Sequence, residues 1–197
     1  MQPIRLILIA VVVAVLGALA GCETQPPQLS LPELSFAPQP AFKFDAARVE
    51  LTSEYVPPMV APNIEHQVPA SPDSGLRRWA RDRLTAGNVA GVLRFTIIEA
   101  SVVESDLPVT KGITGAFTKD QAKRYTATVD AKLELFDDRG FRRGIATTRQ
   151  SLSRTVPEGV TLNEKDKALF SLVEDLMKSY DEQMNANIRQ YLGAFLF

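Results

Sequence analysis

The stretch that most constrains the fold is residues 124–136, where apolar and polar side chains alternate without a break. One face carries Tyr125, Ala127, Val129, Ala131, Leu133 and Leu135, and the other carries Thr126, Thr128, Asp130, Lys132 and Glu134. A period of two is typical of a strand with one buried and one solvated face. Because a single strand cannot bury that face alone, we predict a sheet that is covered on one side and wet on the other.

Three further segments predict strands of the same sheet. The turn residues Asp137-Asp138-Arg139-Gly140 indicate a hairpin, so residues 141–155 should return antiparallel to the alternating stretch. Residues 92–103 are apolar and rich in β-branched side chains, and residues 47–55 alternate between apolar and polar positions. We expect 47–55 to be the first strand of the domain.

Two segments have helical periodicity. Ser71 is a capping residue before Pro72, and the apolar spacing that follows predicts a helix over 72–86 that ends at Gly87-Asn88. Thr161 and Glu164 match a capping box, and the apolar stripe after them predicts a helix of roughly 30 residues, about 45 Å long. The predicted fold class is α+β with two layers. Two helices cover one face of a four-stranded antiparallel or mixed sheet, in the order strand-helix-strand-strand-strand-helix.

The first residues have the pattern of an export signal. Arg5 supplies a positive charge, and residues 6–20 are apolar or small without interruption. This run of 15 residues is shorter than the roughly 20 that a membrane-spanning helix needs. It fits the apolar region of a cleaved signal peptide.

The tetrapeptide Leu19-Ala20-Gly21-Cys22 at the end of this run resembles the lipobox of bacterial lipoproteins. The resemblance implies cleavage before Cys22 and a diacylglyceryl group on its thiol, with several acyl chains such as palmitate that make attachment stable. Cys22 is the only cysteine, so lipidation would leave no thiol for a disulfide, a metal or catalysis. In such lipoproteins an Asp directly after the cysteine favours retention in the inner membrane. Glu23 occupies that place here, so the resemblance favours the outer membrane. The alternative is an uncleaved N-terminal anchor with a bystander cysteine.

The chain therefore divides into three predicted parts. Residues 1–21 are a lipoprotein signal peptide, 22–46 a lipid-anchored proline-rich tether, and 47–197 a single α+β domain facing the periplasm. Ten of the 13 prolines lie in residues 23–72. Because proline fixes φ and lacks an N–H donor, most of that stretch should be extended and irregular.

The residue pattern does not favour an enzyme, and we expect no catalytic residues, no cofactor and no metal. The one histidine, His66, lies among the prolines, and the chain has neither a Gly-x-Ser-x-Gly elbow nor a His-Glu-x-x-His pair. Asp137 and Asp138 lie in the hairpin turn, where aspartate accepts backbone hydrogen bonds. A net charge of −1 argues against a nucleic-acid binder.

Basic side chains on the helix over 72–86 are the first candidates for contact with a partner or with lipid. Arg77 and Arg81 belong to a local excess of arginine there. Guanidinium groups bind lipid phosphates or an acidic partner. The alternative is an ordinary solubilising helix surface.

The connection over 104–123 is the second candidate, because it is long for a compact domain. It carries Phe117 between Lys111 and Lys119. An apolar tip with basic flanks can enter a membrane surface or a partner's groove. The alternatives are an insertion without fixed structure, or Ile113 and Phe117 packing back on the sheet.

Taken together, these features resemble small bacterial envelope lipoproteins. Residues 112–158, through the runs 117–125 and 155–158, are similar to uncharacterised proteobacterial lipoproteins. The element order is similar to that of the lipopolysaccharide-assembly lipoproteins that plug an outer-membrane barrel. The resemblance implies a non-catalytic accessory or assembly factor, in the inner leaflet of the outer membrane, that binds an envelope protein complex or a lipid or glycan ligand. The alternative is a structural spacer linking the membrane to peptidoglycan.

Overall fold

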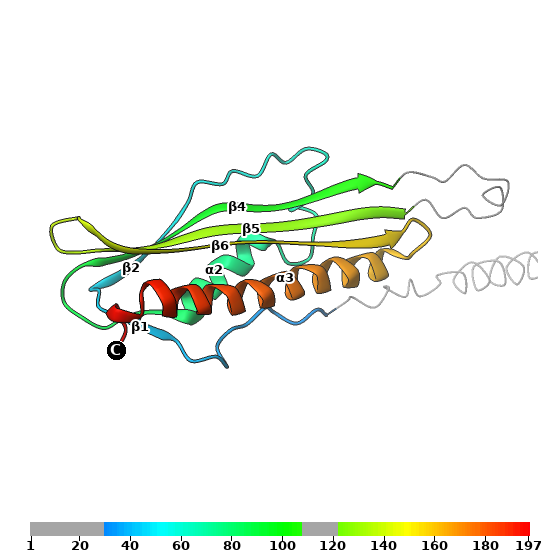
Figure 1. The fold of residues 1–197 in the computed structure, drawn as a ribbon. Coiled ribbons are helices and arrows are strands. Elements are labelled where there is room, and N and C mark those ends of the chain that lie inside the picture. The colour runs from blue at the N-terminus through cyan, green and yellow to red at the C-terminus, as the bar shows by residue number, and fades with distance from the viewer. Residues whose placement is uncertain (1–29, 108–121) are drawn as a thin grey trace, which may run out of the picture. The chain divides into compact units, whose positions relative to one another are not determined.

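The computed structural model describes residues 30–107 and 122–197, and the chain from Leu31 to Phe197 forms one compact unit. Figure 1 shows a layer of strands with helices against it. The elements in chain order are β1 (Phe42–Phe44), β2 (Arg48–Ser53), α2 (Pro72–Arg83), β3 (Leu84–Ala86), β4 (Val92–Asp106), β5 (Ala122–Phe136), β6 (Arg142–Pro157), α3 (Leu162–Tyr191) and the short 3-10 helix η2 (Gly193–Phe195).

The main sheet has four strands in the order β2-β4-β5-β6. β2 runs parallel to β4, and the other neighbours are antiparallel, so the sheet is mixed. α2 packs on β4 and β5, and α3 packs mainly on β6. The predicted α+β class and the predicted order of its six main elements are confirmed.

The inner face of the sheet follows the predicted alternation in β5, and a bulge changes the phase of the buried positions in β4. All six apolar positions of β5 are buried, as are Leu93, Phe95 and Ile97 of β4. A β-bulge between Ile97 and Glu99 then shifts the phase, and Ala100 and Val102 become the buried positions. The extra residue of the bulge lets one long strand keep its small and apolar side chains toward the helices.

The predicted end of the first helix is wrong. α2 ends at Arg83, and Leu84 caps it in an extended conformation, with φ −114° and ψ 126°. Residues 84–86 instead form β3, which pairs in parallel with β1 in a second, two-stranded sheet. Gly87 does not cap the helix, because its N–H donates to the carbonyl of Phe44 at 2.9 Å. Pairing with a distant segment thus overrides the local helical pattern.

The compact unit begins at Leu31 and not at residue 47, where we expected the domain to start. Phe36, Phe42, Phe44 and Ala46 are buried in the core. Three side chains of α2 also bind the backbone of this segment: Arg78 donates to the carbonyl of Leu34, Arg83 donates to the carbonyl of Pro40, and Asp82 accepts from the N–H of Phe36. Apart from β1, residues 31–46 have no regular secondary structure, and they pack on the helices.

Helix α3 begins at the predicted capping box. The hydroxyl of Thr161 accepts from the N–H of Glu164 at 3.3 Å, and the carboxylate of Glu164 accepts from the N–H of Thr161 at 2.8 Å. The helix also contacts the edge strand β6, where Asn187 donates to the carbonyl of Thr147 at 2.8 Å. This contact occupies one backbone acceptor of the strand. Among the described residues, no helix is long and apolar enough to cross a membrane.

Candidate functional site

Three arginines of α2, Arg77, Arg78 and Arg81, lie on a surface between the helix and two proline-rich segments. The helix starts where the Ser71 hydroxyl accepts from the N–H of Ser74 at 3.2 Å, with Pro72 in the first turn. Arg77 and Arg81 are one helical turn apart, so they project from the same side of α2. Arg77 is held by Asp73 at 2.7 Å, whereas Arg81 is exposed and has no ion pair within residues 30–107 and 122–197.

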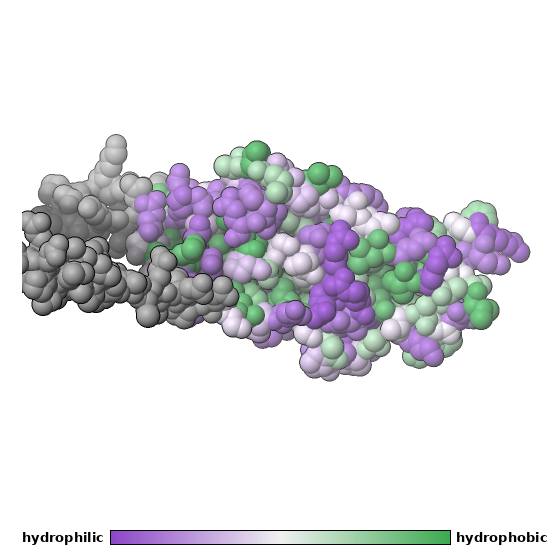
Figure 2. Space-filling view, turned by 180° about the vertical axis from the view of Figure 1, so that it is seen from behind, coloured by the Kyte–Doolittle hydropathy of each residue, from purple (hydrophilic) through white to green (hydrophobic). Residues whose placement is uncertain are grey.

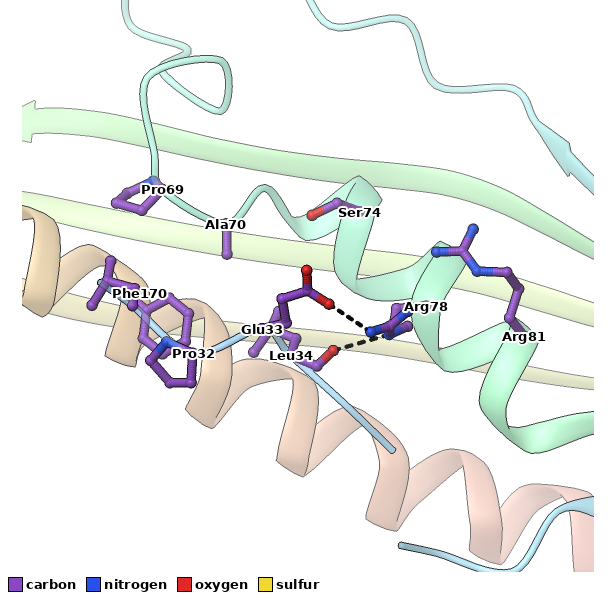
Figure 3. A pocket seen from close by; sticks show the side chains of 10 residues that line it. Pro32, Glu33, Leu34, Pro69, Ala70, Ser74, Arg78, Arg81 and Phe170 are labelled. Carbon is purple, nitrogen blue, oxygen red and sulfur yellow. Dashed lines mark hydrogen bonds and ion pairs between the residues drawn. The ribbon is translucent and has the colours of Figure 1, made fainter. Parts of the chain in front are cut away.

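A first groove, of about 400 Å³, lies beside Arg81. Figure 3 shows Arg78 reaching across it to the carboxylate of Glu33 and the carbonyl of Leu34. Its other walls come from the start of the compact unit, from the segment before α2, and from α3: Leu31, Pro32, Pro69, Ala70, Ser74, Arg81 and Phe170. Arg78 is occupied by this contact, so Arg81 is the cation that the groove leaves available.

A second groove, of about 540 Å³, lies on the Arg77 side of α2. Its floor includes Tyr55, whose hydroxyl donates to Glu65 at 2.9 Å. Glu65 is 4% exposed and also accepts from the N–H of Val102, so it fastens the loop after β2 to β4. Burial, together with the hydrogen bond to Glu65, raises the pKa of Tyr55. The phenol therefore stays protonated and serves as a structural donor.

The two grooves adjoin, because Pro69 and Ser74 line both of them. We call their common rim, with Arg77 and Arg81, the α2 surface. It combines apolar walls with guanidinium groups, a composition suited to amphipathic ligands or lipid head groups rather than to acid–base chemistry. Both predicted contacts of α2, Arg77 and Arg81, lie on this surface. Arg77 is paired with Asp73, whereas Arg81 has no acidic partner there.

The remaining predicted site residues lie outside the described residues. These are the cleavage and lipidation residues Leu19, Ala20, Gly21 and Cys22, and the connection residues Lys111, Phe117 and Lys119. The described ends of that connection are adjacent, since the N–H of Leu107 donates to the carbonyl of Ala122 at 3.2 Å.

Asp137 and Asp138 lie in the turn of the β5–β6 hairpin, as predicted. Asp137 accepts from the N–H groups of Arg139 and Phe141, at 3.0 and 2.8 Å, and Gly140 has a positive φ of 83°. Within the part of the chain that the structure describes, no group of three His, Cys, Asp or Glu side chains is arranged to hold a metal.

Sequence reasoning missed one exposed feature near the second groove. Val56, Met59 and Val60 follow β2 and are 81%, 58% and 63% exposed. Their signal in the sequence is a run without any charged side chain, over 55–64. The prolines of that run predicted only irregular backbone, which concealed it.

The fold is that of a two-layer α+β domain with a mixed sheet and two helices on one face. No protein-family model and no curated protein sequence matches the chain.

Among solved structures, the chain is similar to a minor lipoprotein from Acinetobacter baumannii, at 14% identity and a TM-score of 0.40, covering 70% of this chain and 91% of the other. A rare lipoprotein B from Shewanella oneidensis gives 14% identity and a TM-score of 0.39, with 72% and 93% covered. A Xanthomonas campestris protein of the DUF330 family gives 12% identity and a TM-score of 0.33, with 81% and 97% covered. At scores this low the similarity is partial, and the function of this chain has to come from its own residues.

Proposed function

We propose that this chain is a lipid-anchored envelope protein whose α+β domain binds a partner without catalysing a reaction. The observation that carries the proposal is the tetrapeptide Leu19-Ala20-Gly21-Cys22 at the end of a 15-residue apolar run, with Cys22 as the only cysteine. Such a run is an export signal, and small residues before the cysteine leave the backbone open to a peptidase. The thiolate is the nucleophile that accepts lipid.

The anchor sets the proposed location. Two or more acyl chains hold a protein on a membrane stably, whereas one chain holds it only marginally. Export followed by lipidation on Cys22 leaves the domain facing the periplasm, and Glu23 after the cysteine favours the inner leaflet of the outer membrane. A domain without cysteine must then be stable through packing alone, and its extensive apolar core is in keeping with that need.

The proposed contacts are the α2 surface and the connection between β4 and β5. Arg81 offers an unpaired guanidinium beside an apolar groove. Lys111, Phe117 and Lys119 combine an aromatic side chain with two cations in one connection. The proposed partner is an envelope protein complex, or a lipid or glycan ligand of envelope origin.

Replacing Phe117 by Asp should weaken partner capture and leave the melting temperature nearly unchanged. The reason is that a contact residue contributes to binding, whereas a core residue contributes to folding. In-cell cross-linking followed by purification measures capture, and thermal unfolding of the same variant measures stability. Ser105→Asp, an exposed change on the described side of the connection, is the matched control.

A large loss of stability in the Phe117 variant would instead place this side chain in the core. The same cross-linking separates the proposal from its alternative. A recovered barrel or transporter subunit that depends on Phe117 and Arg81 supports the accessory role, and recovery of peptidoglycan alone supports a spacer.

A further inference from the structure

The loop over 56–60, which we call the apolar loop, exposes more hydrophobic surface than its neighbours. Val56, Met59 and Val60 are all more than half exposed, and two prolines separate them. Figure 2 shows hydrophobic side chains along the upper margin of the molecule, where Figure 1 places the segment that follows β2. Contiguous exposed apolar side chains commonly mark a contact with a membrane or a protein.

The apolar loop is held in place rather than hanging free. Before it, the Tyr55 hydroxyl binds the buried carboxylate of Glu65. After it, Asn63 forms a bridge with Val103 of β4, and the N–H of Ile64 donates to the carbonyl of Val102 at 2.8 Å. Two fixed ends therefore present the apolar side chains outward.

The backbone of the loop carries strain at its tip. Met59 has a φ of 60°, in the left-handed region that side chains other than Gly, Asn and Asp rarely adopt. The surrounding structure must offset the energy of this conformation, and such strain concentrates where a segment has a function. Met59 lines the second groove and is nevertheless more than half exposed, as is Val60.

The apolar loop and the start of the compact unit line two adjoining grooves. Leu31 lines the first groove, Met59 lines the second, and the grooves share Pro69 and Ser74. The nine residues from Cys22 to Leu31 span at most about 30 Å when fully extended. A lipid on Cys22 would thus keep the domain within about that distance of the membrane surface, without fixing which side of the domain faces the membrane.

We infer that the apolar loop inserts into the interfacial region of the phospholipid membrane that holds the Cys22 lipid, an inference that rests on the proposed function. Val56, Met59 and Val60 enter the boundary between head groups and acyl chains, and Arg81 of the α2 surface meets lipid phosphates. The run over 55–64 contains no charged side chain, so no charge has to be desolvated on insertion. The loop thereby orients a domain that the lipid alone would leave free to turn.

The test places a fluorophore on the loop of the full lipidated chain. Acylation occupies Cys22, so Val60→Cys supplies the only free thiol for an environment-sensitive label. The protein is reconstituted in vesicles of phosphatidylethanolamine and phosphatidylglycerol that contain a lipid with a spin label on its acyl chain. The matched control is Val89→Cys, which is 93% exposed and follows β3.

The label at position 60 should shift to shorter wavelength and lose most of its fluorescence to the spin label, while the label at position 89 should do neither. Adding Met59→Asp should abolish the quenching without unfolding the domain, because Asp tolerates the left-handed backbone. The inference is overturned if the chain is acylated and bound to vesicles but its label at position 60 is not quenched. The proposed function would still stand, and the apolar loop would then bind a protein partner. A chain without acyl mass overturns both.

Discussion

Replacing Asp181 by Ala should lower the free energy of unfolding by about 3–5 kcal/mol, because it leaves a buried guanidinium without its partner. Asp181 of α3 accepts from Arg83 at 2.9 Å and from the indole of Trp79 at 2.8 Å. The two charged side chains are only 2% and 10% exposed, and Arg83 also lies over the ring of Phe42 at 4.9 Å. The pair of Asp181 and Arg83 thus joins α2, α3 and the segment that contains β1. Chemical denaturation of the purified domain measures the loss.

Two variants make this prediction specific. Asp175→Ala removes a carboxylate that is 49% exposed and pairs with Arg154, so it should cost less than about 1 kcal/mol. The double variant Arg83→Met with Asp181→Leu should recover much of the loss, since it removes the pair without stranding a charge. A cost for Asp181→Ala no larger than that for Asp175→Ala would contradict the network.

Replacing Phe44 by Ala should destabilise the domain by about 3–5 kcal/mol, the usual cost of a cavity in place of a buried phenylalanine. Phe44 is fully buried in β1, and its carbonyl accepts from the N–H of Gly87. It also forms a bridge with Leu196 near the C-terminus. Thermal and denaturant unfolding of the variant measure the effect.

Glu33 is the matched control in the same proline-rich segment. Its side chain is 85% exposed and bound only to the surface of α2, so Glu33→Ala should change stability by no more than about 0.5 kcal/mol. If Phe44→Ala were equally mild, residues 31–46 would be a tether that rests on the domain without stabilising it.

The main elements could be predicted because their signals are local and strong. The alternation over 124–136 defines β5, the turn at 137–140 defines the β5–β6 hairpin, and the Thr161–Glu164 capping box marks the start of α3. In each case the hydrophobic period agrees with the turn or cap beside it. Agreement between local signals is what makes such predictions hold.

The features that sequence reasoning missed depend on contacts between distant residues. The β1–β3 sheet pairs Phe42 with Leu84, and nothing near either residue indicates the other. The bulge in β4 depends on its register with β5, and the burial of Phe36 depends on the distant residues of the core that it joins. Proline content predicted irregular backbone over 31–46, but irregular backbone can pack on a domain as well as leave it.

In the candidate site, too, local features could be predicted, and features that depend on contacts between distant residues could not. Arg77 and Arg81 could be found from composition and helical spacing, whereas the ion pair to Asp73 that occupies Arg77 and the grooves beside both depend on the folded chain. The apolar loop escaped notice because a run of prolines and apolar residues has no period. Its exposure follows from the anchoring of Tyr55 and Ile64 at either end.

The most direct test of the lipid-anchored domain is the intact mass and membrane fractionation of the expressed full-length chain beside Cys22→Ala. The account predicts a mature species that begins at Cys22, carries added acyl mass and sediments with membranes, and it predicts that the variant loses both the mass and the sedimentation. An unmodified chain that keeps Met1 and stays on the membrane in both forms would contradict it, and the first residues would then act as an uncleaved anchor.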